Sequence, residues 1–359
     1  MKKLFLGLIL LVIAAAGVLV LIPSPIDAAA YHPPEPPALS GPLTVNHHLD
    51  QVNVLAPEAV HGAEDVDVDK QGRVYGATED GAIVRVNTDG SVETIATTGG
   101  RPLGLHWDAT GNLIICDAFK GLLSMAPSGK LTTLLTEVDG QPLVFTDDLE
   151  IAADGTIYFT DASVKYDQKH YMLDMLESRP WGRLIAYDPD SGAAKTVLDN
   201  LYFANGVAIS SNQDFVLVNE TYRYRITRHW INGPKQGQSE IFIDNLPGFP
   251  DGVSSSGRGT FWVALPTVRN TQADAMHPKP FVKNIVAKLP DFARPTPQPY
   301  GLILELDEKG QVIRSLHDPE GDNFSFITSV QEYDNTLYLG SLYSDGIGVL
   351  ALTTLSKPE

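Results

Sequence analysis

The amino-acid sequence predicts an all-β protein, a six-bladed β-propeller with an N-terminal transmembrane helix. Six segments share one plan, in which a short lead-in is followed by an apolar strand, a turn and a second strand. Four of the six carry a glycine at the same distance from the first strand. An unbroken apolar run, residues 4–22, stands before them. Because six such units can close into a ring without exposed sheet edges, the repeats favour a closed propeller.

Length and composition limit the class of protein. The chain has 359 residues, of which 43% are hydrophobic and 19% charged, so it can form a sizeable core as one closed β domain. The formal net charge of −18 argues against a nucleic-acid partner, because phosphates require basic surfaces. The single cysteine, Cys116, stands in an apolar strand-like run, and we expect a buried thiol there.

The N-terminus has the features of a membrane anchor. Two lysines precede residues 4–22, and this run is close to the roughly 20 residues that span a bilayer. We expect residues 1–30 to be the anchor, with a single-pass protein whose propeller lies on the non-cytoplasmic side. The alternative is a signal peptide cleaved near Ala28, which would leave a secreted protein. Residues 31–45 are rich in proline and form the expected linker, and residues 46–359 form the propeller.

The six segments can be aligned on the first aliphatic residue of each first strand. These residues are Val66, Leu105, Leu149, Val207, Val253 and Val330. Two residues earlier lies what we call the register position, occupied by Glu64, Leu103, Asp147, Asn205, Asp251 and Thr328. A glycine follows eight residues after it in four segments, at Gly72, Gly111, Gly155 and Gly259. The alignment did not use this glycine, so its recurrence supports the register.

Four of the register positions carry a side-chain oxygen. They are Glu64, Asp147, Asn205 and Asp251. The innermost strands of a propeller surround its axis, so equivalent positions converge at one end of the central channel. Carboxylates that close together require a counter-ion. Calcium takes 6–8 oxygen ligands, whereas magnesium prefers a smaller shell with more water. The sequence therefore predicts a calcium site, with Asp148 orienting a ligand or a bound water.

The same residues have a plainer interpretation. Asn205-Gly206 and Asp251-Gly252 are both favourable turn dipeptides. The shared register weighs against this alternative, because the turns of the repeat come later in each segment.

Several stretches are similar to one known family. They are "GRLIAYDPDSG", "LYFANGVAIS", "NETYRYRITRHWINGPKQGQSEIFIDNLPGFPDG" and "FWVALPTVRN". On these residues the chain resembles the strictosidine-synthase-like proteins, in the branch of the adipocyte plasma-membrane-associated protein. That group is related to the gluconolactonases, the paraoxonases and diisopropyl fluorophosphatase. The resemblance covers nearly all of the chain after the linker. It implies a six-bladed propeller with calcium in the channel, held by Glu64, Asp147, Asn205 and Asp251.

Departures from the family pattern bear on activity. The third-blade ligand is usually asparagine, and Asp147 implies tighter calcium binding with weaker Lewis acidity. Strictosidine synthase has a catalytic glutamate where this chain has Thr328, which argues against alkaloid-forming condensation. Paraoxonases have a histidine at Leu103, and gluconolactonases a sugar-binding arginine at Phe145. The family often has asparagine at Gly252. The replacement of that arginine by Phe145 implies a substrate more apolar than a sugar lactone.

Two insertions, near residues 165–180 and 270–298, show helical spacing of apolar residues and could cover the channel. We call them the lid segments. The expected lid residues are Tyr171, Met172, Met175, Phe281 and Ile285. The alternative is that these side chains only anchor surface helices to the propeller.

The sequence thus predicts a membrane-anchored, calcium-dependent hydrolase of partly apolar esters or lactones, similar to arylesterases and lactonases. Asp251 or Asp147 would act as general base or nucleophile, and the choice between these roles stays open. Leu103, Phe145, Thr328, Tyr171 and Phe281 would line the substrate pocket. The alternative is a non-catalytic calcium propeller that binds a ligand or a partner protein, because a fold alone does not determine function.

Overall fold

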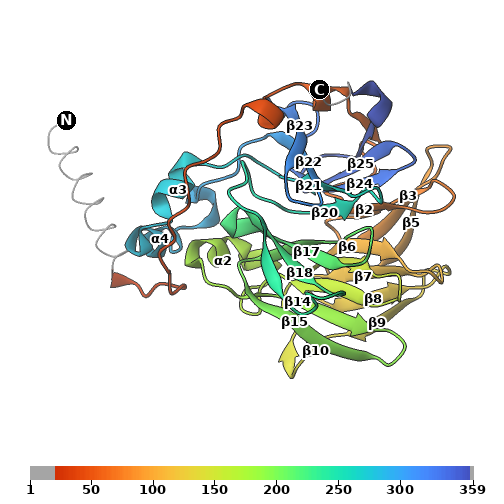
Figure 1. The fold of residues 1–359 in the computed structure, drawn as a ribbon, viewed down its shortest axis with the longest axis horizontal. Helices are drawn as coiled ribbons and strands as arrows, with labels where there is room; N and C mark the ends of the chain where they lie inside the picture. The colour runs from red at the N-terminus through yellow and green to blue at the C-terminus, as the bar shows by residue number, and fades with distance from the viewer. Residues whose placement is uncertain (1–20, 356–359) are drawn as a thin grey trace, which may run out of the picture.

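The computed structural model describes residues 21–355 of the chain (Figure 1). Six four-stranded antiparallel sheets make up the body, which confirms the predicted six-bladed propeller. The expected transmembrane helix falls almost entirely on residues outside the described range. Within residues 21–355, no helix combines the length and the apolar character that a membrane span requires.

In each blade the strand that comes first in this order lies innermost, and the others follow outward. Blade 1 is β2 (Val66–Val68), β3 (Val74–Ala77), β4 (Ala82–Val86) and β5 (Val92–Thr97). Blade 2 is β6 (Pro102–Trp107), β7 (Leu113–Asp117), β8 (Gly121–Met125) and β9 (Leu131–Leu135). Blade 3 is β12 (Thr146–Ile151), β13 (Ile157–Asp161), β14 (Gly182–Asp188) and β15 (Ala193–Leu201).

The other three blades follow the same plan. Blade 4 is β16 (Ala204–Ile209), β17 (Phe215–Glu220), β18 (Arg225–Trp230) and β19 (Ser239–Ile243). Blade 5 is β20 (Val253–Ser255), β21 (Thr260–Ala264), β22 (Gly301–Asp307) and β23 (Val312–Asp318). Blade 6 is β24 (Ile327–Tyr333), β25 (Thr336–Ser341), β26 (Ile347–Ala351) and β1 (Asn53–Leu55). A separate hairpin joins β10 (Glu137–Val138) and β11 (Gln141–Pro142).

Blade 6 closes the ring, because its outermost strand comes from the other end of the chain. Strand β1 pairs antiparallel with β26, with Val54 opposite Gly348. The six innermost strands contact one another in sequence order around the axis, and β24 contacts β2. Closure leaves no innermost strand without a neighbour on either side.

Turn chemistry and packing explain why the repeats fold in this way. Gly72, Gly111, Gly155 and Gly259 all have positive φ, between 75° and 90°, as their turns require. Blade 4 has Gln213 there, and its backbone still adopts φ 59°. The core lies mainly between neighbouring blades. Between blades 4 and 5, for example, Phe215 and Leu217 pack in one buried cluster with Phe261 and Val263.

Both lid segments contain helices. The first holds η3 (Gln168–His170) and α2 (Tyr171–Glu177). The second holds α3 (Thr271–Met276), α4 (Pro280–Val286) and η5 (Asp291–Ala293). The remaining short helices are η1 (Gly41–Leu43), η2 (His48–Gln51), η4 (Thr221–Arg223) and η6 (Leu352–Thr354). Helices α2, α3 and α4 lie together on one side of the propeller, next to the first described residues (Figure 1).

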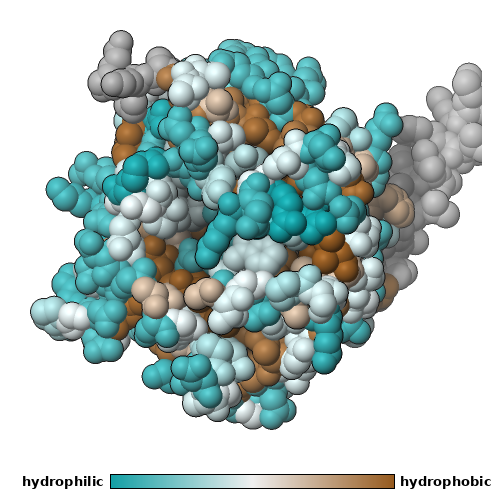
Figure 2. Space-filling model, turned by 90° about the vertical axis from the view of Figure 1, so that its right-hand side faces the viewer, coloured by the Kyte–Doolittle hydropathy of each residue, from teal (hydrophilic) through white to brown (hydrophobic). Residues whose placement is uncertain are grey.

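Figure 2 shows the surface of the side that lies opposite these helices. Hydrophilic residues cover most of it, and apolar residues form separate patches (Figure 2).

Candidate functional site

Five of the six register positions line one cavity at an end of the channel. They are Glu64, Leu103, Asp147, Asn205 and Asp251, and the cavity has a volume of about 330 Å³. All five side chains are buried. Thr328 does not line this cavity, although the sequence placed it in the pocket. Its hydroxyl donates a hydrogen bond to the backbone oxygen of Glu64 (2.6 Å), so it joins blade 6 to blade 1.

β-Bulges set the direction of several register side chains. In blade 3 the ladder between β12 and β13 shifts between Thr146 and Leu149, so that Asp147 and Asp148 fall inside the bulge. Blades 2 and 4 shift at the equivalent place. A bulge re-aims the side chains of an otherwise alternating strand. Two adjacent acids can therefore serve different purposes at Asp147 and Asp148.

The carboxyl groups at the register positions strongly affect one another. Burial raises the pKa of Glu64 well above its usual value, and the neighbouring charges of Asp251 and Asp147 raise it further. Burial also raises the pKa of Asp147, together with the charge of Asp251. For Asp251, burial raises the pKa to about 7, although the nearby Asn205 amide opposes the shift. Three buried acids therefore favour an added positive charge between them.

These residues fit a calcium ion in the chemistry of their donor atoms. The oxygen Oδ1 of Asp251 is buried and has no hydrogen-bond partner among the described residues. An unsatisfied carboxylate oxygen beside two other acids and an amide is the donor set that a hard cation prefers. In the part of the chain described, no three His, Cys, Asp or Glu side chains are already grouped closely enough to hold a metal ion. The donor set is thus assembled in one cavity, and binding would require its oxygens to draw together.

The contacts of Asp148 indicate another role than the expected one, which was to orient a ligand or a bound water. Its Oδ1 accepts a hydrogen bond from the backbone N–H of Leu149 (2.8 Å), and its Oδ2 accepts one from Val207 (2.8 Å). Val207 belongs to the next blade, two residues after Asn205. Asp148 therefore ties β12 to β16, and it positions the strand that carries a candidate ligand.

The glycines beside the ligands do not form turns. Asn205 and Gly206 lie within β16, and the interpretation of the dipeptide as a turn is wrong. A Cβ at Gly206 would lie 2.4 Å from the backbone oxygen of Asp251, and one at Gly252 would lie 2.4 Å from that of Thr328. Adjacent blades approach too closely here for any side chain. In this chain, the place where the family resemblance leads one to expect asparagine therefore accepts only glycine at position 252.

The cavity wall comes from a second ring of residues that we did not anticipate from the sequence. Two positions before the register position, five blades contribute side chains: Arg101, Phe145, Phe203, Phe249 and Phe326. Only Phe145 was expected to line the pocket. The sequence contains the pattern that identifies them, because all five stand two residues before a register position. Four phenylalanines make the wall apolar.

Arg101 is the charged member of this wall. It is buried, and both Nη atoms donate to the backbone oxygen of Gly62 (3.2 Å each). Burial lowers the pKa of Arg101, while the charges of Glu64 and Glu79 oppose this shift. The negative charges nearest to the guanidinium in effect are those of Glu64 and Glu79, which also line the cavity. Arg101 therefore offers positive charge to the cavity.

The lid segments supply the outer wall. Tyr171, Met172 and Met175 of α2 line the cavity, as the sequence led us to expect. Phe281 does not, because it lies on the exposed face of α4 with 67% of its surface accessible. No histidine is among the described residues that line the cavity.

Comparisons with known proteins agree with the fold and define the family. A profile for strictosidine synthase matches residues 147–234, and one for the N-terminal part of strictosidine-synthase-like proteins matches residues 41–86. Among solved structures, a gluconolactonase from Xanthomonas campestris superposes with a TM-score of 0.62 at 16% identity, over 92% of this chain and 99% of the other. A calcium-binding protein, regucalcin, from Agrobacterium tumefaciens gives a TM-score of 0.57 at 14% identity, over 85% and 92%. These two likenesses concern the fold alone.

Relatives at higher identity cover almost the entire chain. The adipocyte plasma membrane-associated protein of Rattus norvegicus is 36% identical over 96% of this chain and 98% of its own length. The human protein of that name is 36% identical over 95% of this chain and 88% of its own length. A strictosidine-synthase-like protein of Arabidopsis thaliana is 35% identical over 88% and 85%. The chain therefore belongs to the strictosidine-synthase-like family, in the group of the adipocyte plasma membrane-associated proteins.

Proposed function

We propose that the protein is a membrane-anchored, calcium-dependent hydrolase of esters or lactones with apolar parts. The observation that carries the proposal is one cavity in which three buried acids and Asn205 form the base and phenylalanines form the wall. The likeness in fold to a gluconolactonase and to a calcium-binding protein supports it. The name of the mammalian relatives supports a location at a membrane.

Some residues of the cavity would bind the substrate, and others would take part in the reaction. Phe145 and Phe203 pack edge to face with ring centroids 5.2 Å apart, and they offer an apolar surface to the non-reacting part of a substrate. Arg101 can donate to a substrate oxygen, because guanidinium N–H groups bind carbonyl and carboxylate oxygens well. When bound, calcium would supply a positive charge that polarises the carbonyl group. Asp251 or Asp147 would then accept a proton or attack the carbonyl carbon.

The lid limits which substrates fit. Met172 and Met175 of α2 are flexible apolar side chains that adapt to irregular partners. With a volume of about 330 Å³, the cavity accepts a small aryl ester or a medium-sized lactone. A polar sugar lactone would leave its hydroxyl groups without partners against the phenylalanines, which costs affinity.

The test is turnover of aryl esters and hydrophobic lactones as a function of free calcium concentration. The wild type, Asp251→Ala and the control Asp190→Ala are compared, because Asp190 is an exposed residue of the turn between β14 and β15. We expect weak activity that rises with calcium in the wild type and the control, and none in Asp251→Ala. Activity that survives chelation, or that Asp251→Ala retains, would rule out the proposal.

A second candidate function is calcium-dependent binding without catalysis. The absence of histidine among the described residues that line the cavity favours it, since histidine is the commonest general base. Tight calcium binding without turnover of any ester or lactone would select this alternative.

A further inference from the structure

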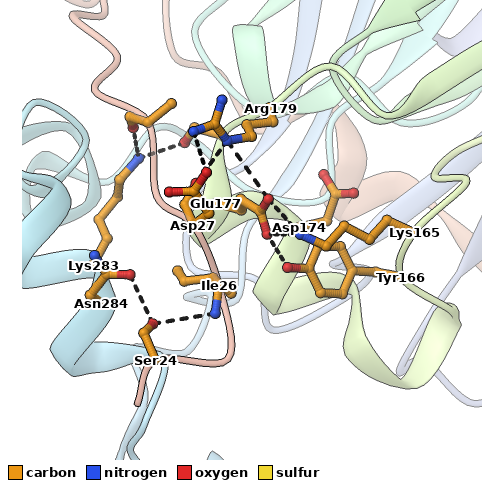
Figure 3. A network of polar contacts seen from close by, with 12 residues as sticks. Ser24, Ile26, Asp27, Lys165, Tyr166, Asp174, Glu177, Arg179, Lys283 and Asn284 are labelled. Atoms are coloured by element: carbon orange, nitrogen blue, oxygen red, sulfur yellow. Dashed lines mark hydrogen bonds and ion pairs between the residues drawn. The ribbon is translucent and has the colours of Figure 1, made fainter. Parts of the chain in front are cut away.

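The segment that follows the apolar N-terminal run is held firmly by the lid segments. We call residues 24–35 the strap. Ser24 donates to the side-chain oxygen of Asn284 on α4 (2.8 Å), and Arg179 donates to Asp27 (2.6 Å), as Figure 3 shows. The buried Lys283 of α4 donates to the backbone oxygen of Ala29 (2.5 Å). The strap is therefore part of the folded body. It comprises the end of the expected anchor, residues 1–30, and the start of the expected linker, residues 31–45.

Apolar packing holds the strap in the same place. Ile26 is buried in a cluster with Leu173 and Leu176 of α2 and with Met276 of α3. Backbone hydrogen bonds extend the contact, from Ala29 to Glu177 (2.8 Å) and from Tyr31 to His277 (3.0 Å). The segment directly after the apolar run is thus fixed against the lid helices.

Large apolar side chains project into solvent at this end of the molecule. Leu21 is 83% exposed and precedes the strap. Phe281 and Val282 of α4 are 67% and 38% exposed, on the helix that carries Asn284. Phe292 of η5 is 91% exposed. Exposed aromatic and aliphatic residues in this number are costly in water and indicate an interaction surface.

The charge of this surface differs from that of the whole protein. Residues 279–294 contain four basic residues and one acidic residue, in a chain with a net charge of −18. One of the four, Lys283, is buried against the strap, so three basic residues remain for the surface. Lys279 is exposed, and Lys288 and Arg294 are partly exposed. Basic residues beside exposed phenylalanines are typical of segments that lie in the interface of an anionic membrane.

We propose that α4 and η5 lie in the headgroup region of a membrane, with Phe281 and Phe292 inserted among the lipids. This membrane is the one that the apolar N-terminal run would span. This proposal rests on the proposed membrane anchor and not on the proposed activity. The segment 295–298, which directly follows the basic stretch, lines the cavity. The cavity would then open at the membrane surface, so esters dissolved in the membrane would reach it without crossing bulk water.

The test measures contact with lipid at single positions of the full-length chain. Phe281→Cys and Phe292→Cys are labelled with an environment-sensitive fluorophore, and Cys116 is buried and does not compete. The control is Ile241→Cys on β19, where the native residue is 45% exposed. Each protein is reconstituted into vesicles of phosphatidylcholine and phosphatidylserine. Quenching by spin-labelled lipid and by aqueous iodide is then compared.

We expect lipid quenching at positions 281 and 292 and iodide quenching at position 241. Vesicles of phosphatidylcholine alone should give weaker lipid quenching at 281 and 292, because the basic residues lose their anionic partner. Equal iodide quenching at all three positions would overturn the proposal. Protection from both quenchers, together with disulfide cross-linking of Phe281→Cys between two copies, would also overturn it and identify a dimer surface. None of these readouts depends on enzyme activity.

Discussion

The buried side-chain amide of Asn219 donates a hydrogen bond to the backbone oxygen of Asp251 at 2.5 Å. The same oxygen accepts the backbone N–H of Gly206 at 2.9 Å. Two donors from blade 4 therefore hold the backbone of the fifth-blade ligand. The position of the Asp251 carboxylate depends on its neighbouring blade as well as on its own.

Replacing Asn219 should weaken calcium binding without removing a ligand. We expect Asn219→Leu to lower calcium affinity by about 10–100-fold, as losses of supporting hydrogen bonds do in metal sites. The free energy of unfolding should fall by about 1–3 kcal/mol, because a buried hydrogen bond is lost. Calcium titration and denaturant unfolding measure the two effects, with the exposed Asn212→Ala as control. Unchanged affinity in Asn219→Leu would contradict this role.

Asp147→Asn should separate calcium affinity from turnover. The change restores the ligand type that the family resemblance implies and removes one negative charge. Calcium should bind more weakly, yet turnover at saturating calcium should rise, since a less neutralised cation polarises a carbonyl more strongly. Turnover measured against calcium concentration gives both quantities. A fall in turnover at saturation would show that the Asp147 carboxylate takes part in the chemistry.

His106 should make stability depend on pH. Its ring lies 3.1 Å from Asp67 and 3.3 Å from Glu150. Burial lowers its pKa, but Glu150 and Asp67 outweigh this effect and raise the pKa to about 10. Since the folded pKa exceeds the unfolded value of about 6.5, the stabilisation is complete below pH 6.5 and is lost as the pH rises through 10. The difference in unfolding free energy between wild type and His106→Gln should therefore shrink across this range. A difference that stays constant would contradict the ion pairs.

The strap should contribute strongly to stability through one side chain. Ile26→Ala is expected to lower the free energy of unfolding by about 2–5 kcal/mol, as truncation of a buried isoleucine does. Ile22 lies just before the strap and is 47% exposed, so Ile22→Ala should change stability by no more than about 0.5 kcal/mol. Unfolding of the full-length protein in detergent measures both. Equal effects of the two changes would show that the strap does not pack as described.

The sequence was sufficient to predict the features that repeat from blade to blade. The strand–turn–strand plan recurs in all six blades. The left-handed turn glycines recur in four blades, and so does an oxygen-bearing side chain at the register position, at Glu64, Asp147, Asn205 and Asp251. The ring of phenylalanines repeats as well, and it was missed because only one position of the register was read across all six segments.

Features that join segments distant in sequence could not be predicted. Thr328 was expected in the pocket because it stands at a register position. The repeat pattern does not reveal that its hydroxyl donates to the backbone oxygen of Glu64. Phe281 looked like a lid residue, because helical spacing identifies an apolar face without showing what that face contacts. The strap depends on contacts between Ile26 and helices more than 140 residues away along the chain. Patterns within a short stretch of sequence do not predict contacts between segments so far apart.

The measurement that tests the account most directly is a crystal structure of the protein grown with calcium, with anomalous scattering used to locate the ion. We predict one ion at the end of the channel, with side-chain oxygens of Glu64, Asp147, Asn205 and Asp251 at about 2.3–2.6 Å. An ion bound away from these residues, or no ion while the four oxygens stay apart at saturating calcium, would contradict the central claim.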